Sequence, residues 1–397
     1  MSKFRLGIIG LGMTRAMYGP PLRHLPGVEL SAVADVSTDA RTFARETMRA
    51  TATFESVDDM FRNVKLDGVI VASPPWLHLK HVEQAARSGV AVLVEKPMAR
   101  SPAEADAMVR VCREAGVPLY VAFNRRFHPA LATATQMVRR GELGDVFHVD
   151  CIWTSWSAQG DGGWRDTRQT LGGVFQDHGA HTFDLAMQWL GDVETVSAQA
   201  QLIGPALGVG REVEDHLTAL ARHARGTSLH LHSRASHRPV SEMYRLYGTR
   251  ATLELEYTGD WAFVAPDAWE MRLHQNGNHR PQTLVARRPD GDMNIPLSDG
   301  LFAYYVELSL FVEALRAGDP GILPEGDAGA LAVRCVSAAY LAALKEQCMK
   351  PSETDEFGES TFARLIEKLS RGIGSSNLSH LDKRSVEKAS CTSVPWM

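Results

Sequence analysis

The sequence predicts an α/β protein with two domains: a doubly wound parallel sheet, then an α+β domain with a large, mostly antiparallel open sheet. Up to residue 123, short apolar runs rich in β-branched residues alternate with helical patterns. A glycine turn follows the first of these runs. From about residue 193 to residue 273, alternating runs follow one another without helical patterns between them, which is typical of an antiparallel sheet with one packed face.

Six strands are expected in the first domain, which we place at residues 1–123. They are residues 4–9, 28–34, 53–54, 68–72, 91–94 and 118–123. Helical patterns lie between them, and the one over 102–115 has proline in its first turn and Gly116 just past its end. Strands that alternate with helices predict a parallel sheet covered on both faces.

The glycine turn predicts a dinucleotide site. Gly10 and Gly12 follow the first strand, where a bare backbone and a helix N-terminus can approach a pyrophosphate. Asp35 ends the second strand, close to where an acidic residue accepts hydrogen bonds from a ribose. The fingerprint is incomplete because Arg15 replaces its third glycine, and Pro20-Pro21 shorten or kink the next helix. The alternative is an α/β turn that binds nothing.

The acidic residue also predicts the choice of cofactor. Asp35 should accept both ribose hydroxyls of NAD and repel the 2′-phosphate of NADP. No arginine follows it directly, although Arg41 lies near the start of the next helix and could soften the preference. We therefore expect NAD, with NADP as the second possibility.

The stretch AVLVEKP, residues 91–97, ends a buried strand in a lysine. Ligands of open α/β sheets bind in the crevice beyond the strand ends, and Lys96 lies there. Pro97 stops the strand and could do so through a cis peptide bond. The alternative is an ordinary solvated lysine at a strand end.

The second domain is expected over residues 124–350. A helix reaches about Arg140, a strand follows at 146–153, and a polar, aromatic loop follows at 155–170. Two long helices are expected at 301–317 and 327–346. The polar remainder, 351–397, should be a mobile tail in which 362–369 could form a short amphipathic helix. Truncation after Met349 should therefore leave fold and cofactor binding intact.

One helix of this domain, 176–191, carries an acid–histidine stripe. Asp177, His181, Asp184 and Gln188 are spaced 4, 3 and 4 residues apart and so share a face. The alternatives are a structural Asp–His pair and a zinc site of Asp177, His178 and His181, for which nothing fixes a further ligand. We assign no metal. His230 and His232 share a strand face, and we assign them no role. Three tryptophans either belong to the core or pack on a polyhydroxylated ring: Trp153, Trp156 and Trp164.

Composition excludes several classes of function. The 397 residues carry a net charge of −5, with 44% hydrophobic and 22% charged residues. This balance disfavours nucleic acid and anionic membranes as partners, and no apolar run spans a bilayer. The five cysteines are scattered without a CxxC, which is typical of a reducing cytoplasm.

Taken together, these motifs make the chain resemble the Gfo/Idh/MocA oxidoreductases, the family of glucose–fructose oxidoreductase and inositol dehydrogenase. The resemblance covers about residues 4–350. Its motifs are GIIGLG (7–12), ASPPWLH (72–78), EKP (95–97), NRRF (124–127) and GGVFQDHGAHTFD (172–184). It implies a Rossmann domain, a C-terminal domain whose open sheet often makes oligomer contacts, and hydride transfer between a nicotinamide cofactor and a sugar, cyclitol or related polyol.

The resemblance also implies the site residues and a homo-oligomer, either dimer or tetramer. The catalytic residues it implies are Lys96, Asp177 and His181. The expected cofactor contacts are Gly10, Gly12, Met13, Asp35, Ser73, Pro74, His78, Glu95, Lys96 and Asn124. The expected substrate contacts are Arg126, Trp164, Arg165, Asp177 and His181.

In the expected mechanism His181 is the general base, Asp177 orients its imidazole, and Lys96 stabilises charge on the reacting oxygen. Two other functions stay open. One is a glycosidase that retains NAD and oxidises its substrate transiently. The other is a sugar-responsive regulator that binds dinucleotide without turnover.

Overall fold

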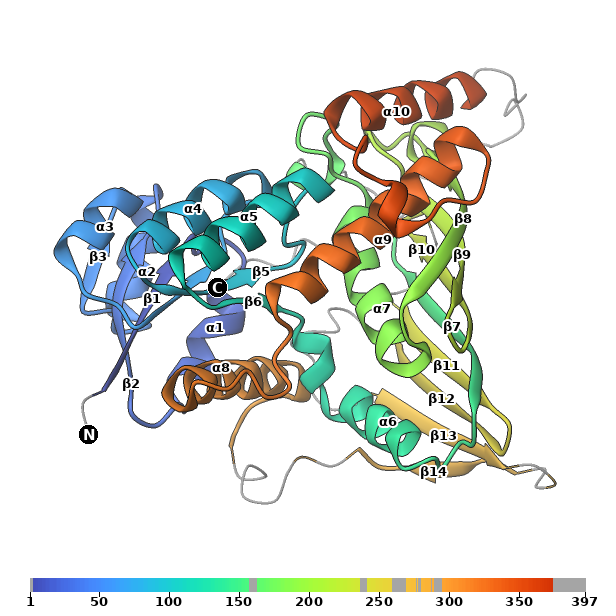
Figure 1. Cartoon of the computed structure of the whole chain (residues 1–397), viewed down its shortest axis with the longest axis horizontal. Coiled ribbons are helices and arrows are strands. Elements are labelled where there is room, and N and C mark those ends of the chain that lie inside the picture. The colour runs from blue at the N-terminus through green and yellow to red at the C-terminus, as the bar shows by residue number, and fades with distance from the viewer. Residues whose placement is uncertain are drawn as a thin grey trace.

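The protein is described here by a computed structural model. It describes residues 3–156, 163–235, 241–258, 269–275, 277, 280–286, 288 and 295–373. Two sheets stand side by side, each with its own helices, and a group of helices lies between them (Figure 1).

The first sheet confirms the predicted doubly wound architecture. Its six strands run in parallel in the order β3-β2-β1-β4-β5-β6. They are β1 (Phe4–Ile9), β2 (Val28–Ala34), β3 (Ala52–Phe54), β4 (Gly68–Val71), β5 (Ala91–Glu95) and β6 (Leu119–Ala122). The helices between them are α1 (Arg15–Leu22), α2 (Thr38–Glu46), α3 (Val57–Asn63), α4 (Pro75–Arg87) and α5 (Pro102–Ala115). Strand order reverses between β1 and β4, where such sheets bind ligands.

Alternate residues of these strands enter two different cores. Val69, Val71 and Val92 pack with α4 and α5 on one face. Ile70 and Leu93 pack on the opposite face with α1 and α2. This division follows from the two-residue period of a strand, and it buries both faces of the sheet.

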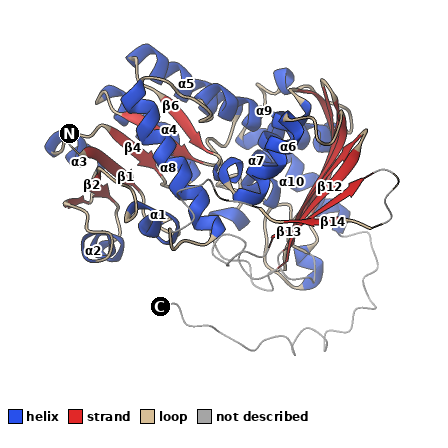
Figure 2. Ribbon diagram, turned by 90° about the horizontal axis from the view of Figure 1, so that it is seen from below, coloured by secondary structure: helices blue, strands red, loops and turns tan. Residues whose placement is uncertain are grey.

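One helix predicted for the second domain packs on the first sheet. Helix α8 (Asp299–Ala317) lies against α1 (Figure 2), and the rings of Tyr18 and Tyr304 meet edge to face at 5.3 Å. Phe311 packs so close to Gly68 that a Cβ there would lie 2.8 Å from its ring. Figure 1 shows α8 below the parallel sheet. The chain therefore returns to its first domain, and a division at residue 123 does not describe this helix.

The second sheet is mostly antiparallel, as predicted. Its order is β14-β13-β12-β11-β7-β10-β9-β8, and β7 and β10 are its one parallel pair among the described strands. Its strands are β7 (Val146–Thr154), β8 (Val193–Gln201), β9 (His216–His223), β10 (Gly226–Ser233), β11 (Ser241–Gly248), β12 (Ala251–Thr258), β13 (Trp269–Gln275) and β14 (Gln282–Leu284). Helices α6 (Pro129–Arg139) and α7 (Val174–Leu190) cover one face of it.

Helix α9 (Gly326–Lys345) joins the two halves. It packs on α5 of the first domain, on α7, and on strand β8 of the second. It is long and apolar enough to cross a membrane, but 67% of its most apolar window is buried inside the protein. Such burial is typical of a core helix, and α9 is one here.

The prediction of a mobile tail from residue 351 was wrong for residues 351–373. A short 3₁₀ turn, η4 (Pro351–Glu353), leads into helix α10 (Glu359–Ile373). Phe357 and Phe362 are buried against Tyr340 of α9, at ring-centroid distances of 5.6 and 5.4 Å. Lys368 Nζ donates to two carbonyls at the end of α9. The few apolar residues of this segment lie on one helix face. The average composition of the segment does not show this pattern, which is why the prediction failed. Residues 374–397 lie outside the described residues.

Candidate active site

The glycine turn has the shape that a dinucleotide needs. Gly10 has a φ of +82°, and a Cβ on it would lie 2.5 Å from the Cα of Ser73. A side chain is therefore excluded there. Gly12 has nothing within 4 Å of its Cβ position, so the turn is open on that side. Helix α1 starts at Arg15 and continues through both prolines for eight residues.

Asp35 lies beside this turn, at the end of β2. Its Oδ2 accepts from the backbone N–H of Leu11 at 2.6 Å, and its Oδ1 accepts from that of Ser37 at 2.7 Å. Arg41 donates to the backbone carbonyls of Asp35 and Val36, and its guanidinium lies 3.7 Å from Glu55. The carboxylate thus borders the ribose position, while the nearby arginine is engaged elsewhere.

We expect this arrangement to favour NAD. Wild-type protein should bind NAD at least about tenfold more tightly than NADP, because Asp35 would face the 2′-phosphate while the nearby cation, Arg41, is held by backbone carbonyls and by Glu55. The variant D35S should narrow that ratio by about tenfold, which corresponds to about 1.4 kcal/mol. Fluorescence titration with both cofactors measures the ratio, and K80M on the exposed face of α4 is the control. Equal affinity of the wild type for both cofactors would refute the expectation.

The loop after β4 is held by two histidines. Ring nitrogens of His78 lie 2.6 Å from the carbonyl of Ser73 and 3.1 Å from that of Met98. Ser73 Oγ lies 2.8 Å from His81 Nδ1. Because both nitrogens of His78 face protein carbonyls, this residue shapes the turn. Its contact with the cofactor stays a prediction.

Lys96 meets the helix of the second domain. It follows β5 with a cis peptide bond to Pro97. Its Nζ lies 3.2 Å from both Oδ1 and the carbonyl oxygen of Asp177. The side chains of Lys96 and Asp177 are only 12% and 4% exposed, so this ion pair is largely removed from water. Glu95 is buried beside it and accepts from Tyr18 at 2.8 Å.

Asp177 is surrounded by three cations, Lys96, Arg165 and Arg234, and by the imidazole of His178. Its Oδ2 lies 2.6 Å from Nε of Arg165, 3.3 Å from Arg234 and 3.4 Å from Nε2 of His178. Burial alone would raise the pKa of Asp177, but Arg165 and Lys96 outweigh it and bring the pKa well below its ordinary value. The carboxylate therefore stays ionised over the working range of pH.

The imidazole of His181 is not hydrogen-bonded to Asp177, which was expected to orient it. Its ring is 2% exposed and lies edge-on to Phe123 at 6.0 Å. Both ring nitrogens lack a hydrogen-bond partner among the described residues. The carboxylate of Asp177, one turn earlier, instead contacts Lys96, Arg165, Arg234 and His178. Burial, with Lys96 as the next cause, brings the pKa of His181 well below its usual value, so the imidazole is neutral.

The predicted substrate residues lie around this cluster. Arg126, from the 3₁₀ turn η1 (Asn124–Phe127), forms a two-fold ion pair with Asp184. Arg165 stacks on Trp164 at 4.5 Å, and its NH1 lies 3.8 Å from Sδ of Met13 in the glycine turn. Arg165 thus bridges from the second domain to the cofactor side.

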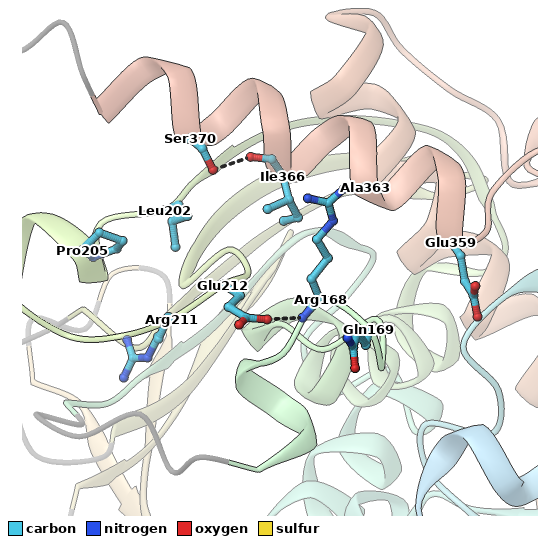
Figure 3. A pocket seen from close by; sticks show the side chains of 10 residues that line it. All are labelled: Arg168, Gln169, Leu202, Pro205, Arg211, Glu212, Glu359, Ala363, Ile366 and Ser370. Atoms are coloured by element: carbon cyan, nitrogen blue, oxygen red, sulfur yellow. Dashed lines mark hydrogen bonds between the residues drawn. The ribbon is translucent and has the colours of Figure 1, made fainter.

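Two members of the cluster were not predicted. His178 stacks on Trp153 at a centroid distance of 3.9 Å, and Arg234 follows the end of β10. The zinc alternative named His178, but no group of three or more His, Cys, Asp or Glu side chains among the described residues could hold a metal ion. A cavity of about 960 Å³ lies elsewhere, between α10 and the loop at Arg168, and Figure 3 shows that Lys96 and Asp177 are not among its lining residues.

The start of α7 is held by a buried carboxyl group. The residue that precedes the helix, Gly173, has no side chain to cap it, and Oε1 of Glu214 instead accepts from the N–H of Phe175 at 3.1 Å. The hydroxyl of Tyr340 donates to the same oxygen at 2.7 Å. Burial raises the pKa of Glu214 to about 8.

Glu214 should make the stability depend on pH. Because its folded-state pKa lies above the ordinary glutamate value of 4.5, its stabilising contribution is complete below pH 4.5 and is lost as pH rises through about 8. Between pH 6 and pH 9 the wild type should lose on the order of 2–3 kcal/mol of unfolding free energy from this group. In urea unfolding over the same pH range, the unfolding free energy of E214Q should fall by about 2–3 kcal/mol less than that of the wild type. An equal loss in both proteins would contradict this assignment.

Comparison with known proteins now places this site in a family. The family model described as the oxidoreductase family with an NAD-binding Rossmann fold matches residues 4–123. The model of the GFO/IDH/MocA C-terminal domain matches residues 131–254. The chain belongs to the Gfo/Idh/MocA family. It is an NAD(P)-dependent oxidoreductase, and the predicted family, fold, enzyme class and cofactor are confirmed.

Among curated family members, the rhizopine catabolism protein MocA of Rhizobium meliloti is 32% identical over 191 residues, which cover 48% of this chain and 58% of that protein. Inositol 2-dehydrogenase of the same species is 25% identical over 344 residues, covering 84% and 95%. Among solved structures, an aldose-aldose oxidoreductase from Caulobacter crescentus is 25% identical with a TM-score of 0.73, covering 88% and 99%. A levoglucosan dehydrogenase in complex with NADH and levoglucosan has a TM-score of 0.76 at 19% identity over the same shares, which supports the fold.

Proposed function

We propose that this enzyme moves a hydride between NAD(P) and the secondary alcohol or ketone of a sugar, cyclitol or related polyol. The observation that carries the proposal is the meeting of Lys96, from the end of β5, with Asp177 of α7, at 3.2 Å beside the neutral His181. Family members named inositol 2-dehydrogenase and D-apiose dehydrogenase support this class of substrate.

The charge of each residue suggests its role in the reaction. The nicotinamide cofactor, when bound, accepts or returns the hydride. Lys96 would donate a hydrogen bond to the reacting oxygen and stabilise negative charge on it. Asp177, held ionised by Arg165 and Arg234, would fix the position of the Lys96 ammonium. His181 would take the proton of the alcohol at a ring nitrogen and return it in the reverse reaction.

The glycine turn fits a bound dinucleotide. Gly10 leaves no room for a side chain, and Gly12 leaves its outer side open. Asp35 would meet the ribose, and Arg165 could reach the cofactor because it already contacts Met13 of this turn. These contacts stand apart from the group of Lys96 and His181 that would act on the substrate.

A screen of inositols, neutral sugars and sugar acids with NAD and NADP tests the proposal. Absorbance of the reduced cofactor should rise with at least one polyol in proportion to free NAD consumed. Cleavage of a glycoside without net NADH would support the glycosidase alternative, and binding without turnover would support the regulator. Assembly into a dimer or tetramer stays a prediction, which light scattering in solution would test.

A further inference from the structure

A continuous chain of buried imidazoles and hydroxyls runs along β10 from the candidate active site. We call it the histidine relay, and it consists of His232, Thr182, His230, Ser228 and His223. Thr182 Oγ1 lies 3.2 Å from Nε2 of His232 and 3.0 Å from Nδ1 of His230. Ser228 Oγ lies 2.7 Å from Nε2 of His230 and 2.7 Å from Nε2 of His223. All five residues are at most 3% exposed, and Thr182 joins the relay from α7, which packs on β10.

The far end of the relay fixes one proton. Nδ1 of His223 lies 2.8 Å from the carbonyl oxygen of Gly191, which can only accept, so Nδ1 carries the proton. Burial lowers the pKa of His223, and it brings the pKa of His230 well below 6.5 and that of His232 to about 3. Each imidazole is therefore neutral and has one N–H.

The remaining protons follow from that one. Because Nε2 of His223 is bare, Ser228 donates its single proton to it and accepts from Nε2–H of His230. Nδ1 of His230 is then bare and buried. The hydroxyl of Thr182 has a second acceptor, the carbonyl oxygen of Gly179 at 3.1 Å, but its single proton goes to His230 because the other choice would leave this ring nitrogen without a donor. Thr182 then accepts from Nε2–H of His232. Every donor along the relay points the same way, and the acceptor left over is Nδ1 of His232.

The ring that carries this acceptor lies near the catalytic cluster. Nδ1 of His232 is buried and has no hydrogen-bond partner among the described residues. The rings of His232 and His178 are 6.4 Å apart, which one bridging water can span. His178 in turn lies 3.4 Å from the carboxylate of Asp177, whose other oxygen contacts Lys96.

The far end of the relay lies near acidic groups. His223 ends β9, and the carboxylates of Asp192 and Glu194 act on its pKa in the raising direction. Both residues are exposed. A proton that reaches His223 therefore has acceptors in contact with water close by.

We propose that the histidine relay carries the proton of the polyol reaction between the enclosed site and the surface. This rests on the proposed function, in which alcohol oxidation releases one proton. His181 takes that proton from the alcohol and gives it up to the water that can bridge His178 and His232. That water passes a proton to Nδ1 of His232 while the Nε2–H of the same ring passes to Thr182. The Thr182 proton passes to His230, the Nε2–H of His230 to Ser228, and the Ser228 proton to His223, from which one proton leaves. Ketone reduction runs the same transfers backward.

Interrupting the relay should separate proton release from hydride transfer. S228A removes one link, T182V removes another, and T182S keeps the hydroxyl. The control is T135V, since Thr135 is an equally buried hydroxyl that bonds Trp189 at 3.0 Å and lies outside the relay. Stopped-flow absorbance of NADH and of a pH-indicator dye, in weakly buffered solution, follows both events in the full-length enzyme with NAD and the best polyol of the screen.

In the wild type, T182S and T135V, proton release should keep pace with NADH formation. In S228A and T182V proton release should lag roughly 10²-fold, the lower end of the usual worth of a positioned proton-transfer group. Synchronous release in both interrupted variants would overturn the relay and leave the proposed function intact. A wild type that forms no NADH with any polyol would overturn both.

Histidine tautomers give a second test that needs no turnover. In ¹⁵N-histidine-labelled protein, His223 should carry its proton on Nδ1, and His230 and His232 on Nε2. Signals are assigned by their loss in H223Q, H230Q and H232Q. A proton on Nδ1 of His230 in the resting enzyme would break the sequence of donors and overturn the relay.

Discussion

Replacing His181 by alanine or Lys96 by methionine is expected to lower turnover by about 10²–10⁴-fold, the usual worth of a positioned acid–base group. The alanine removes the neutral imidazole that would take the alcohol proton. The methionine keeps most of the volume of Lys96 but removes the charge that faces the reacting oxygen. NADH formation on the best substrate of the screen measures both losses.

Cofactor affinity separates a catalytic from a structural loss. NAD binding should change far less than turnover in both variants, because Asp35 and the glycine turn lie apart from them. H24A and K80M alter a histidine and a lysine that are exposed on the first domain, and they serve as matched controls. Near-full turnover in both H181A and K96M would show that the acid–histidine stripe of α7 is structural.

Much of this site could be predicted because its signals are local. A short apolar run rich in β-branched residues placed β5, and the importance of Lys96 at its end followed from where parallel sheets bind ligands. Helical spacing placed Asp177 and His181 on α7. In each case one element of the chain carried the information, so no knowledge of its neighbours in space was needed.

The partners of Asp177 could not be predicted in the same way. Arg234 is 57 residues away along the chain and reaches the carboxylate only because β10 lies under α7. Helical spacing puts two side chains on one face but does not say what each one meets. Asp177 meets the loop of Arg165, whereas His181 meets Phe123.

The role of β10 was missed for a related reason. Two histidines at alternate positions of a strand are common, and their spacing shows only that both face the same side. Thr182, which connects these two histidines, comes from α7. Ser228, two residues before His230 on the same strand, connects His230 to His223 of β9. These residues form a chain because α7 packs on β10 and brings Thr182 between the two histidines.

Removal of residues 351–397 is expected to cost several kcal/mol of stability, contrary to the expectation from composition alone. The truncation exposes Tyr340 and removes Phe357 and Phe362, each of which is at most 3% exposed. Loss of one buried phenylalanine side chain costs about 3–5 kcal/mol. It also leaves the carbonyls at the end of α9 without the ammonium of Lys368. Urea unfolding and the melting temperature measure the effect.

Two matched variants locate the cause. Truncation after Ile373 removes only residues 374–397 and should leave the unfolding transition unchanged, whereas F362A should lose about 3–5 kcal/mol with the chain at full length. Helix α10 also holds Arg168, through Glu367 at 3.1 Å, on the loop that carries Arg165. The longer truncation should therefore weaken NAD binding as well. A protein ending at residue 350 that melts with the full-length transition would show that α10 contributes nothing to the core.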